Sequence, residues 1–253
     1  MEGIFARRRA LVIGGTGGIG RAVALGLAAR GADLIIHGGH SAERLESALA
    51  EARGKAAAGA RIEGFLFPVA APVSKAAETI LAKTAELSGT GAPDILVLAW
   101  GPFHRSPLRE TKPEKWYFLA ESNFVFPGIL ISALIGDMII RGWGRILLFG
   151  GTNTETIRGF STTAAYSAAK TALGVLAKSA AKSAGNAGVT CNVVCPGLTD
   201  TEYTGEKEQT YHRGKNPGGK GLSPEDIAAM ALNLLENPVV NGAVLPLDGG
   251  VSV

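Results

Sequence analysis

The stretch LVIGGTGGIG, residues 11–20, joins a short apolar run to a cluster of glycines. Residues 11–13 have the length and composition of a buried strand, and residues 19–29 have the spacing of a helix that stops at Gly31. The glycines are therefore predicted to form a tight turn between the first strand and the first helix.

The same alternation of apolar run and helical segment continues to the end of the chain. Further apolar runs lie at 34–36, 65–67, 95–99, 145–149, 189–194 and 244–247, and helical patterns at 41–53, 74–87, 113–140, 163–184 and from 223 onward. Apolar strands separated by helices indicate a parallel sheet buried on both faces. We predict an α/β fold over residues 1–253, a single-domain doubly wound parallel sheet (Rossmann-like) of about seven strands with helices on both faces.

Ligands of such sheets bind beyond the carboxyl ends of the strands, where the loops after residues 13, 36, 99, 149 and 194 are expected to share one cleft. The glycine turn leaves backbone N–H groups open to a pyrophosphate at the positive end of a helix. Its spacing fits several glycine patterns and is weak evidence alone, and a purely structural turn is the alternative. Its place between strand and helix predicts a dinucleotide site made by Gly14, Thr16, Gly17, Gly18, Ile19 and Gly20.

The second strand ends in His37-Gly38-Gly39-His40-Ser41, without the acid that usually binds the ribose of NAD. The missing carboxylate removes a repulsion against a 2′-phosphate, and His40, Ser41 and Arg44 are candidate donors to it. We therefore predict NADP in preference to NAD. The alternative is that His37 and His40 are ordinary loop histidines.

Composition excludes several other classes of protein. With 46% hydrophobic residues, 19% charged residues and a net charge of +3, the chain suits a compact globular protein. The basic run 7–9 is interpreted as a solvated strand entry, and no nucleic-acid partner is predicted. Cys191 and Cys195 are interpreted as buried apolar residues, and no metal site is predicted.

The most apolar helix candidate, residues 124–140, is interrupted by Pro127 and Asp137. It barely reaches spanning length, so we expect a helix buried in the protein or at a subunit interface rather than in a membrane. The N-terminal residues show no secretory pattern, and a cytoplasmic location is predicted.

Tyr166 and Lys170 lie four residues apart in a helical segment, so their side chains share one face. A nearby ammonium favours the phenolate and is expected to lower the tyrosine pKa. The pair is a plausible acid/base unit for interconverting a carbonyl and an alcohol.

Four segments then carry a resemblance to a known family. They are 116–123, which ends in Asn123, 164–173 around Tyr166 and Lys170, 192–197 with Cys195-Pro196-Gly197, and 241–250 with Asp248-Gly249-Gly250. Together with the glycine turn, they resemble the single-domain branch of the short-chain dehydrogenase/reductase family over essentially the whole chain. The chain is similar to 3-oxoacyl-(acyl-carrier-protein) reductases in particular.

The resemblance implies a nicotinamide-dependent oxidoreductase. Tyr166 would exchange a proton with the substrate oxygen, Lys170 would hold the nicotinamide ribose, and Asn123 would position a water molecule. Further residues would line the cofactor, namely Gly14, Gly18 and Gly20 at the phosphates, Thr201 at the carboxamide or pyrophosphate, and Gly101, Pro196, Gly197 and Thr199. It also implies a homodimer or homotetramer formed by the apolar helices 113–140 and 163–184.

The sequence departs from the family pattern at two places. Leu98-Ala99-Trp100-Gly101 replaces the usual Asn-Asn-Ala-Gly, and no serine stands at the end of the fifth strand. Counting from the strand leads to Gly151, and counting back from Tyr166 leads to Asn153. We expect Thr152 to supply the missing hydroxyl, with Thr154 and then Asn153 as alternatives.

Two questions about function stay open at this point. If no residue replaces the serine, the chain would be a catalytically impaired cofactor-sensing protein. The polar, glycine-rich substrate loop at about 199–221 favours a small or polar carbonyl/alcohol substrate, or an acyl chain on a carrier.

Overall fold

The computed structural model describes residues 4–89 and 91–251 and contains one seven-stranded parallel sheet. Its strands are β1 (Arg9–Ile13), β2 (Asp33–Gly38), β3 (Ile62–Leu66), β4 (Ile95–Leu98), β5 (Gly144–Phe149), β6 (Val189–Pro196) and β7 (Val244–Leu247). They lie in the order β3-β2-β1-β4-β5-β6-β7, so the direction of winding reverses between β1 and β4. The predicted Rossmann-like architecture is confirmed.

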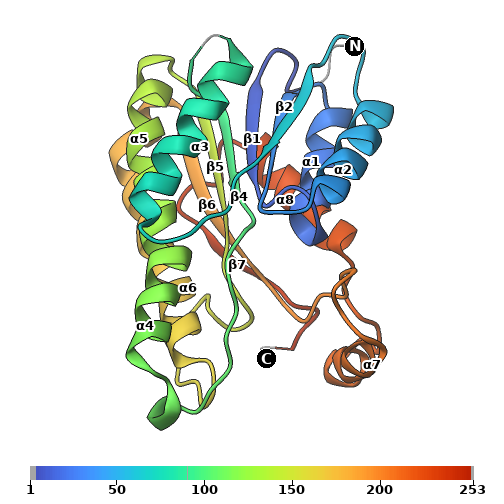
Figure 1. Ribbon diagram of the computed structural model, residues 1–253, viewed down its shortest axis with the longest axis vertical. Coiled ribbons are helices and arrows are strands. Elements are labelled where there is room, and N and C mark those ends of the chain that lie inside the picture. The colour runs from blue at the N-terminus through green and yellow to red at the C-terminus, as the bar shows by residue number, and fades with distance from the viewer. Residues whose placement is uncertain (1–3, 90, 252–253) are drawn as a thin grey trace.

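Helices cover both faces of this sheet, as Figure 1 shows. The helices are α1 (Gly18–Ala29), α2 (Ala42–Lys55), α3 (Val73–Ser88), α4 (Pro113–Ala120), α5 (Phe126–Ile140), α6 (Ala164–Ala184), α7 (Glu206–Lys215) and α8 (Pro224–Glu236). Short helical turns are η1 (Leu108–Glu110), η2 (Glu121–Val125) and η3 (Gly185–Ala187). Helices α1, α2 and α8 pack on one face, and α3, α5 and α6 pack on the other.

Alternate residues of each strand supply the two cores. Ala10 and Val12 of β1 join the core beneath α1, α2 and α8, whereas Leu11 and Ile13 join the opposite core. Every residue of β5 and β6 is buried. The central strands therefore have apolar residues without alternation because both of their faces are covered.

Local sequence signals account for several helix ends. The Ser41 hydroxyl accepts a hydrogen bond from the Arg44 backbone N–H at the start of α2. Ser223 and Asp226 cap the start of α8 reciprocally, with Pro224 as its first residue. These side chains satisfy N–H groups that have no partner within the helix.

Two elements differ from the sequence-based prediction. The segment 199–221 was expected to be an irregular substrate loop, but it contains α7. None of the residues of α7 is buried, so its sequence has no apolar stripe that would predict a helix. The predicted helix 113–140 is interrupted by η2, a π-helical turn that contains Asn123. Such turns insert one extra residue into a helix and often mark functional sites.

Two arginines of the basic run near the N-terminus make contacts with other parts of the protein. The Arg9 backbone N–H donates to Asp94 at 2.9 Å, and the Arg8 guanidinium lies 4.0 Å from the ring centroid of Trp143. The cysteines are both buried and unpaired, as predicted.

Candidate active site

A cavity of about 620 Å³ opens at the carboxyl ends of β4, β5 and β6. Its walls come from the start of α1, the segments after these three strands, α6 and α7. The lining residues are Ile19, Ala99, Gly101, Phe103, Arg105, Phe149, Gly150, Gly151, Thr152, Thr163, Tyr166, Ser167, Lys170, Pro196, Gly197, Leu198, Thr199, Thr201, Thr204 and His212. The cleft predicted from the strand order is thus present, although the loop after β2 does not line it.

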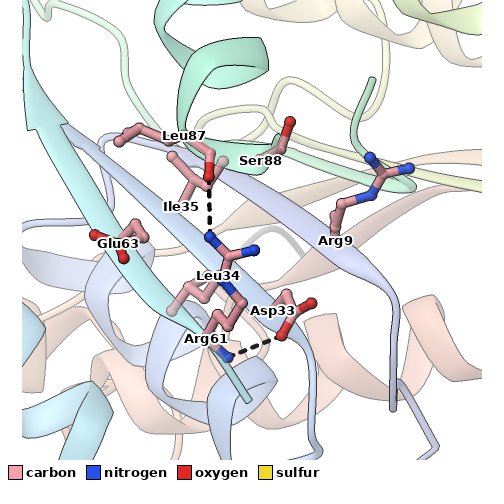
Figure 2. Close-up of a pocket in the computed structure, with 8 residues that line it drawn as sticks. All are labelled: Arg9, Asp33, Leu34, Ile35, Arg61, Glu63, Leu87 and Ser88. Atoms are coloured by element: carbon pink, nitrogen blue, oxygen red, sulfur yellow. Dashed lines mark hydrogen bonds between the residues drawn. The ribbon is translucent and has the colours of Figure 1, made fainter. Parts of the chain in front are cut away.

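A second pocket lies at the opposite, amino-terminal end of the sheet (Figure 2). Its volume is about 20 Å³, which leaves room for a water molecule but not for an organic ligand. Arg61 occupies it, donating from its backbone to Asp33 at 2.8 Å and from its guanidinium to the Leu87 carbonyl at 3.5 Å. We interpret this pocket as structural.

Tyr166 and Lys170 both reach the large cavity from one face of α6, one turn apart. The Lys170 ammonium donates to the Phe149 carbonyl at 2.8 Å and lies 6.0 Å from the centre of the Tyr166 ring. The Phe103 ring packs edge-on against the Tyr166 ring, with ring centroids 5.0 Å apart. The tyrosine is therefore oriented by an aromatic contact, while the lysine is tied to the end of β5.

Burial dominates the electrostatics of this pair. It raises the pKa of the Tyr166 phenol above its ordinary value, to which the Cys195 thiol adds a smaller effect, and it lowers the pKa of Lys170 to about 8. The sequence predicted a lowered pKa for this tyrosine, and this prediction is wrong because desolvation raises it. Tyr166 holds its proton at neutral pH, which makes it a proton donor in this state.

Asn123 lies close behind the pair. Its side-chain amide donates to the carbonyls of Leu119 and Pro102, whereas its Oδ1 atom is buried without a partner among residues 4–89 and 91–251. A Cβ added to Gly101 would lie 2.2 Å from this Oδ1 and 3.0 Å from the Lys170 ammonium nitrogen. Only glycine leaves room there, and the unpaired oxygen is a ready acceptor for a bound water or ligand group.

The end of β5 shows which residue can take the place of a serine. A Cβ at Gly151 would lie 2.8 Å from the Tyr166 hydroxyl oxygen, so the strand end faces the tyrosine without offering a hydroxyl group. Thr152 lines the cavity and donates to the Pro196 carbonyl at 3.1 Å. Of the three candidates, Thr152 alone lines the cavity.

Thr154 and Asn153 serve the turn instead. The buried Thr154 hydroxyl accepts from the Gly151 N–H and donates to the Gly151 carbonyl, both at 2.8 Å. Asn153 adopts a φ of 63°, a left-handed conformation that asparagine tolerates better than most residues. Both residues shape the turn that presents Thr152.

The glycine turn fits the close packing that a dinucleotide site needs. Gly14 has a φ of 77° and faces Trp100, and a Cβ on Gly20 would lie 2.2 Å from the Gly14 carbonyl oxygen. The backbone N–H of Gly18, the first residue of α1, points toward the Thr201–Tyr203 segment. There the Glu202 carboxylate accepts from it at 3.0 and 3.1 Å.

An acceptor anion is thus already held at the helix end where the pyrophosphate was expected. Thr16, Gly17 and the other turn glycines lie outside the lining of the large cavity, and Ile19 is the member of the turn that lines it. A cofactor phosphate would therefore have to displace the Glu202 carboxylate to reach the Gly18 N–H.

The tip of β2 lies beside this turn. A Cβ at Gly38 would approach Thr16 to 2.6 Å, so the two loops are in contact. His37 is not a loop residue but is buried in β2, where its Nε2 atom contacts the Phe67 carbonyl at 2.8 Å. His40 is exposed, whereas the Ser41 hydroxyl is occupied in capping α2.

The nearest large cation at this tip is Arg44. Its guanidinium donates to the Tyr203 hydroxyl at 2.7 Å and lies 4.6 Å from the centre of that ring. Tyr203 and Glu202 both lie against Gly17 of the glycine turn.

Several lining residues were missed by reading the sequence. Phe103 and Arg105 follow β4, and the rule that places ligands after strand ends points to them, although no motif marks them. Thr204 and His212 come from the segment around α7, and only the tertiary structure brings them to Tyr166. The predicted residues Pro196, Gly197, Thr199 and Thr201 do line the cavity.

A parallel sheet with a glycine turn after β1, and a tyrosine–lysine pair in the cavity at its carboxyl edge, defines a class of protein, the dinucleotide-dependent oxidoreductases. The model of the short chain dehydrogenase family matches residues 8–212, and the chain belongs to this family.

Named relatives cover nearly the whole chain. It is 29% identical over 250 residues to 2-dehydro-3-deoxy-D-gluconate 5-dehydrogenase of Formosa agariphila, covering 96% of this chain and 91% of that protein. It is 32% identical over 253 residues to 3-oxoacyl-(acyl-carrier-protein) reductase of Escherichia coli, covering 98% of each.

A solved structure agrees with these relatives. A 3-oxoacyl-(acyl-carrier-protein) reductase of Agrobacterium tumefaciens with NADP bound superposes with a TM-score of 0.85 at 25% identity, over 97% of this chain and 95% of that one. The protein is therefore an oxidoreductase whose cofactor is NADP or NAD.

Proposed function

We propose that the protein interconverts a carbonyl and an alcohol, with Tyr166 as the residue that exchanges a proton with the substrate oxygen. The observation that carries this proposal is that Tyr166, Lys170 and Thr152 line the same cavity, in a chain that belongs to this family. When bound, the nicotinamide supplies or accepts the hydride.

Each residue has a role that its surroundings support. Because burial keeps Tyr166 protonated, its hydroxyl is suited to donating a proton to a carbonyl oxygen as negative charge develops there. Lys170, fixed by the Phe149 carbonyl, would hold the nicotinamide ribose, and a water molecule at Asn123 Oδ1 would pass protons toward solvent. Thr152 would release the Pro196 carbonyl and donate to the substrate oxygen.

We propose NADP as the preferred cofactor. The β2 tip carries no carboxylate, and Arg44 stands beside it within reach of a 2′-phosphate once Tyr203 moves away. Titration with NADPH and with NADH, followed by cofactor fluorescence, tests this choice. Tighter binding of NADH would reverse the preference and leave the oxidoreductase intact.

The decisive experiment for the chemistry is Tyr166→Phe. We expect at least a 10³-fold loss of kcat for NADPH-dependent reduction of a carbonyl substrate, because the phenolic proton is removed while the ring and its packing on Phe103 remain. Cofactor affinity should change little. Unchanged turnover would show that the proton comes from elsewhere and would contradict the assignment.

The rival proposal, a cofactor-sensing protein without catalysis, draws on Gly151, which brings no hydroxyl to the tyrosine. It predicts NADPH binding without turnover of any carbonyl compound in the unmodified protein.

We also propose a homo-oligomer, either a dimer or a tetramer. The helical segment Pro113–Ile140, which includes η2, is long and apolar enough to cross a membrane by length and composition alone. It packs here on α3 and α6 and exposes Tyr117, Val125 and Ile140, and α6 exposes Val175. A second copy of the chain would cover these side chains, and a cytoplasmic location agrees with this proposal.

A further inference from the structure

Besides Tyr166, the titratable side chains that line the cavity are basic rather than acidic. Arg105, Lys170 and His212 line it, and no aspartate or glutamate stands among its lining residues. Lys170 is already bound to the Phe149 carbonyl, so Arg105 and His212 remain for a ligand. A concave site lined by one sign of charge concentrates ligands of the opposite sign.

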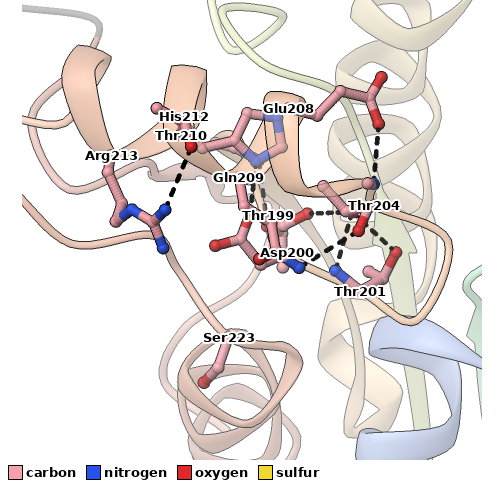
Figure 3. A network of polar contacts seen from close by, with 12 residues as sticks. Thr199, Asp200, Thr201, Thr204, Glu208, Gln209, Thr210, His212, Arg213 and Ser223 are labelled. Atoms are coloured by element: carbon pink, nitrogen blue, oxygen red, sulfur yellow. Dashed lines mark hydrogen bonds and ion pairs between the residues drawn. The ribbon is translucent and has the colours of Figure 1, made fainter.

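His212 is held in place by a network at the base of α7 (Figure 3). Its Nδ1 atom lies 2.6 Å from Asp200 Oδ1, and the Asp200 backbone N–H donates to the Leu222 carbonyl at 2.7 Å. A Cβ at Gly221 would lie 1.9 Å from the Asp200 carboxylate, so a glycine is required beside it. This bracing fixes the ring and leaves Nε2 without a hydrogen-bond partner among the described residues.

Arg105 stands on the wall formed by the segment after β4. Its guanidinium lies 5.9 Å from the ring centre of Phe103, which itself packs against Tyr166. It forms no ion pair with any residue in the ranges 4–89 and 91–251, and its side chain is exposed. Its position beside Phe103 places it on the tyrosine side of the cavity, away from the glycine turn.

We propose that Arg105 and His212 bind a carboxylate, and that the substrate is a small oxo acid or the corresponding hydroxy acid. This proposal rests on the proposed function, because the reacting carbonyl must lie at Tyr166 while the acid group lies at Arg105 and His212. A guanidinium can bind a carboxylate through two N–H groups, and an imidazole nitrogen that carries a proton can donate a further hydrogen bond. Both residues would select substrates by their acid group, and neither would take part in the proton transfer.

The test uses 2-oxo and 3-oxo acids of four to six carbons, each paired with its methyl ester, which keeps the carbonyl and removes the charge. With NADPH as reductant, we expect kcat/KM for at least one acid to exceed that of its ester by more than about tenfold. Arg105→Gln and His212→Gln should each raise KM for that acid by about tenfold, leave kcat nearly unchanged, and leave the ester unaffected.

Two neighbouring cations provide matched controls. Arg109→Gln lies four residues after Arg105, where the side chain pairs with Glu110, and Arg213→Gln follows His212 on α7, where it donates to Thr210. Neither lines the cavity, so both variants should keep the KM of the unmodified protein for the acid.

The possible failures are distinguishable. Equal turnover of acids and esters, or NADPH binding without reduction of any acid in the series, would overturn the carboxylate site. A change of KM that is the same for acid and ester would also overturn it, since this would indicate a structural role for Arg105 or His212. Failure of the protein to bind NADPH at all would contradict the proposed function itself.

Discussion

At the scale of single residues, the site depends on which polar groups are free and which are already engaged. Thr152 and Thr154 are two residues apart, yet the first faces the cavity and the second closes the turn after β5. The two threonines have the same side chain, so only their hydrogen-bond partners distinguish their roles.

We expect Thr152→Val to lower kcat about 100-fold, because a lost oxyanion donor typically costs that much or more. Cofactor affinity should stay within twofold. Thr154→Val should instead destabilise the protein by about 1–3 kcal/mol, since it removes the acceptor of the buried Gly151 backbone N–H. Steady-state kinetics and denaturant unfolding of both variants check this, and the reverse pattern would assign the hydroxyl role to Thr154.

The burial of Lys170 leads us to predict how the stability of the protein depends on pH. Burial lowers its pKa from 10.5 to about 8, so the charged form is disfavoured in the folded state. Below pH 8 both folded and unfolded states carry the proton and the penalty is complete. It disappears as the pH rises from about 8 to 10.5, because the unfolded state then loses its proton too.

Lys170→Met removes this penalty. The gain in unfolding free energy of the variant over the unmodified protein should therefore be largest below pH 8 and shrink by about 3 kcal/mol by pH 10.5. Urea unfolding at several pH values measures it, with Lys178→Met at an exposed position of the same helix as the control. A difference that does not vary with pH would show that Lys170 is not desolvated in the fold.

At the scale of elements, the segment between β6 and α8 brings groups from distant parts of the chain to one edge. Glu202 reaches the start of α1, Tyr203 reaches Arg44, and Thr199 forms an isolated bridge with Leu222. The segment thus contacts both the cofactor side and the substrate side of the cavity.

Glu202→Gln should tighten NADPH binding about twofold to fivefold, because it removes a carboxylate that competes for the positive end of α1. Glu208→Gln, which alters a contact to the Gly205 N–H on the same segment, should leave the affinity unchanged. Fluorescence titration compares the two variants. Equal or weaker binding by Glu202→Gln would mean that the carboxylate does not compete with the cofactor.

At the scale of the whole molecule, the two faces of the sheet are covered differently. Helices α1, α2 and α8 cover one face of the sheet (Figure 1). On the other side, α4, α5 and α6 keep large apolar side chains at the surface. Tyr117 is 72% exposed and Ile140 is 83% exposed. Such exposed apolar side chains are the basis of the proposed oligomer.

Val175→Glu, on the exposed face of α6, should dissociate the proposed oligomer because it would bury a charge in the interface. Val239→Glu is the matched control, since Val239 is also an exposed valine but lies after α8. Light scattering at micromolar concentration gives the mass of each variant. A monomeric unmodified protein would contradict the proposed oligomer.

The sequence by itself determined how strands and most helices alternate along the chain, because each central strand is an apolar run and each crossover has helical spacing. It also determined the Tyr166–Lys170 pair, since a spacing of four on a helix places two side chains on one face whatever the surroundings. The glycine turn could also be predicted from the sequence, because a strand-to-helix turn at Gly14 and Gly20 leaves no room for side chains.

Only the tertiary structure decided what these residues meet. The π-helical turn at Asn123, the helix α7 and the burial of His37 follow from packing between segments far apart in the sequence, which local patterns do not encode. The same holds for the pKa of Tyr166, because the burial that raises it exists only in the folded chain. Arg105 and His212 likewise line one cavity only once the chain is folded, since 107 positions separate these residues in the sequence.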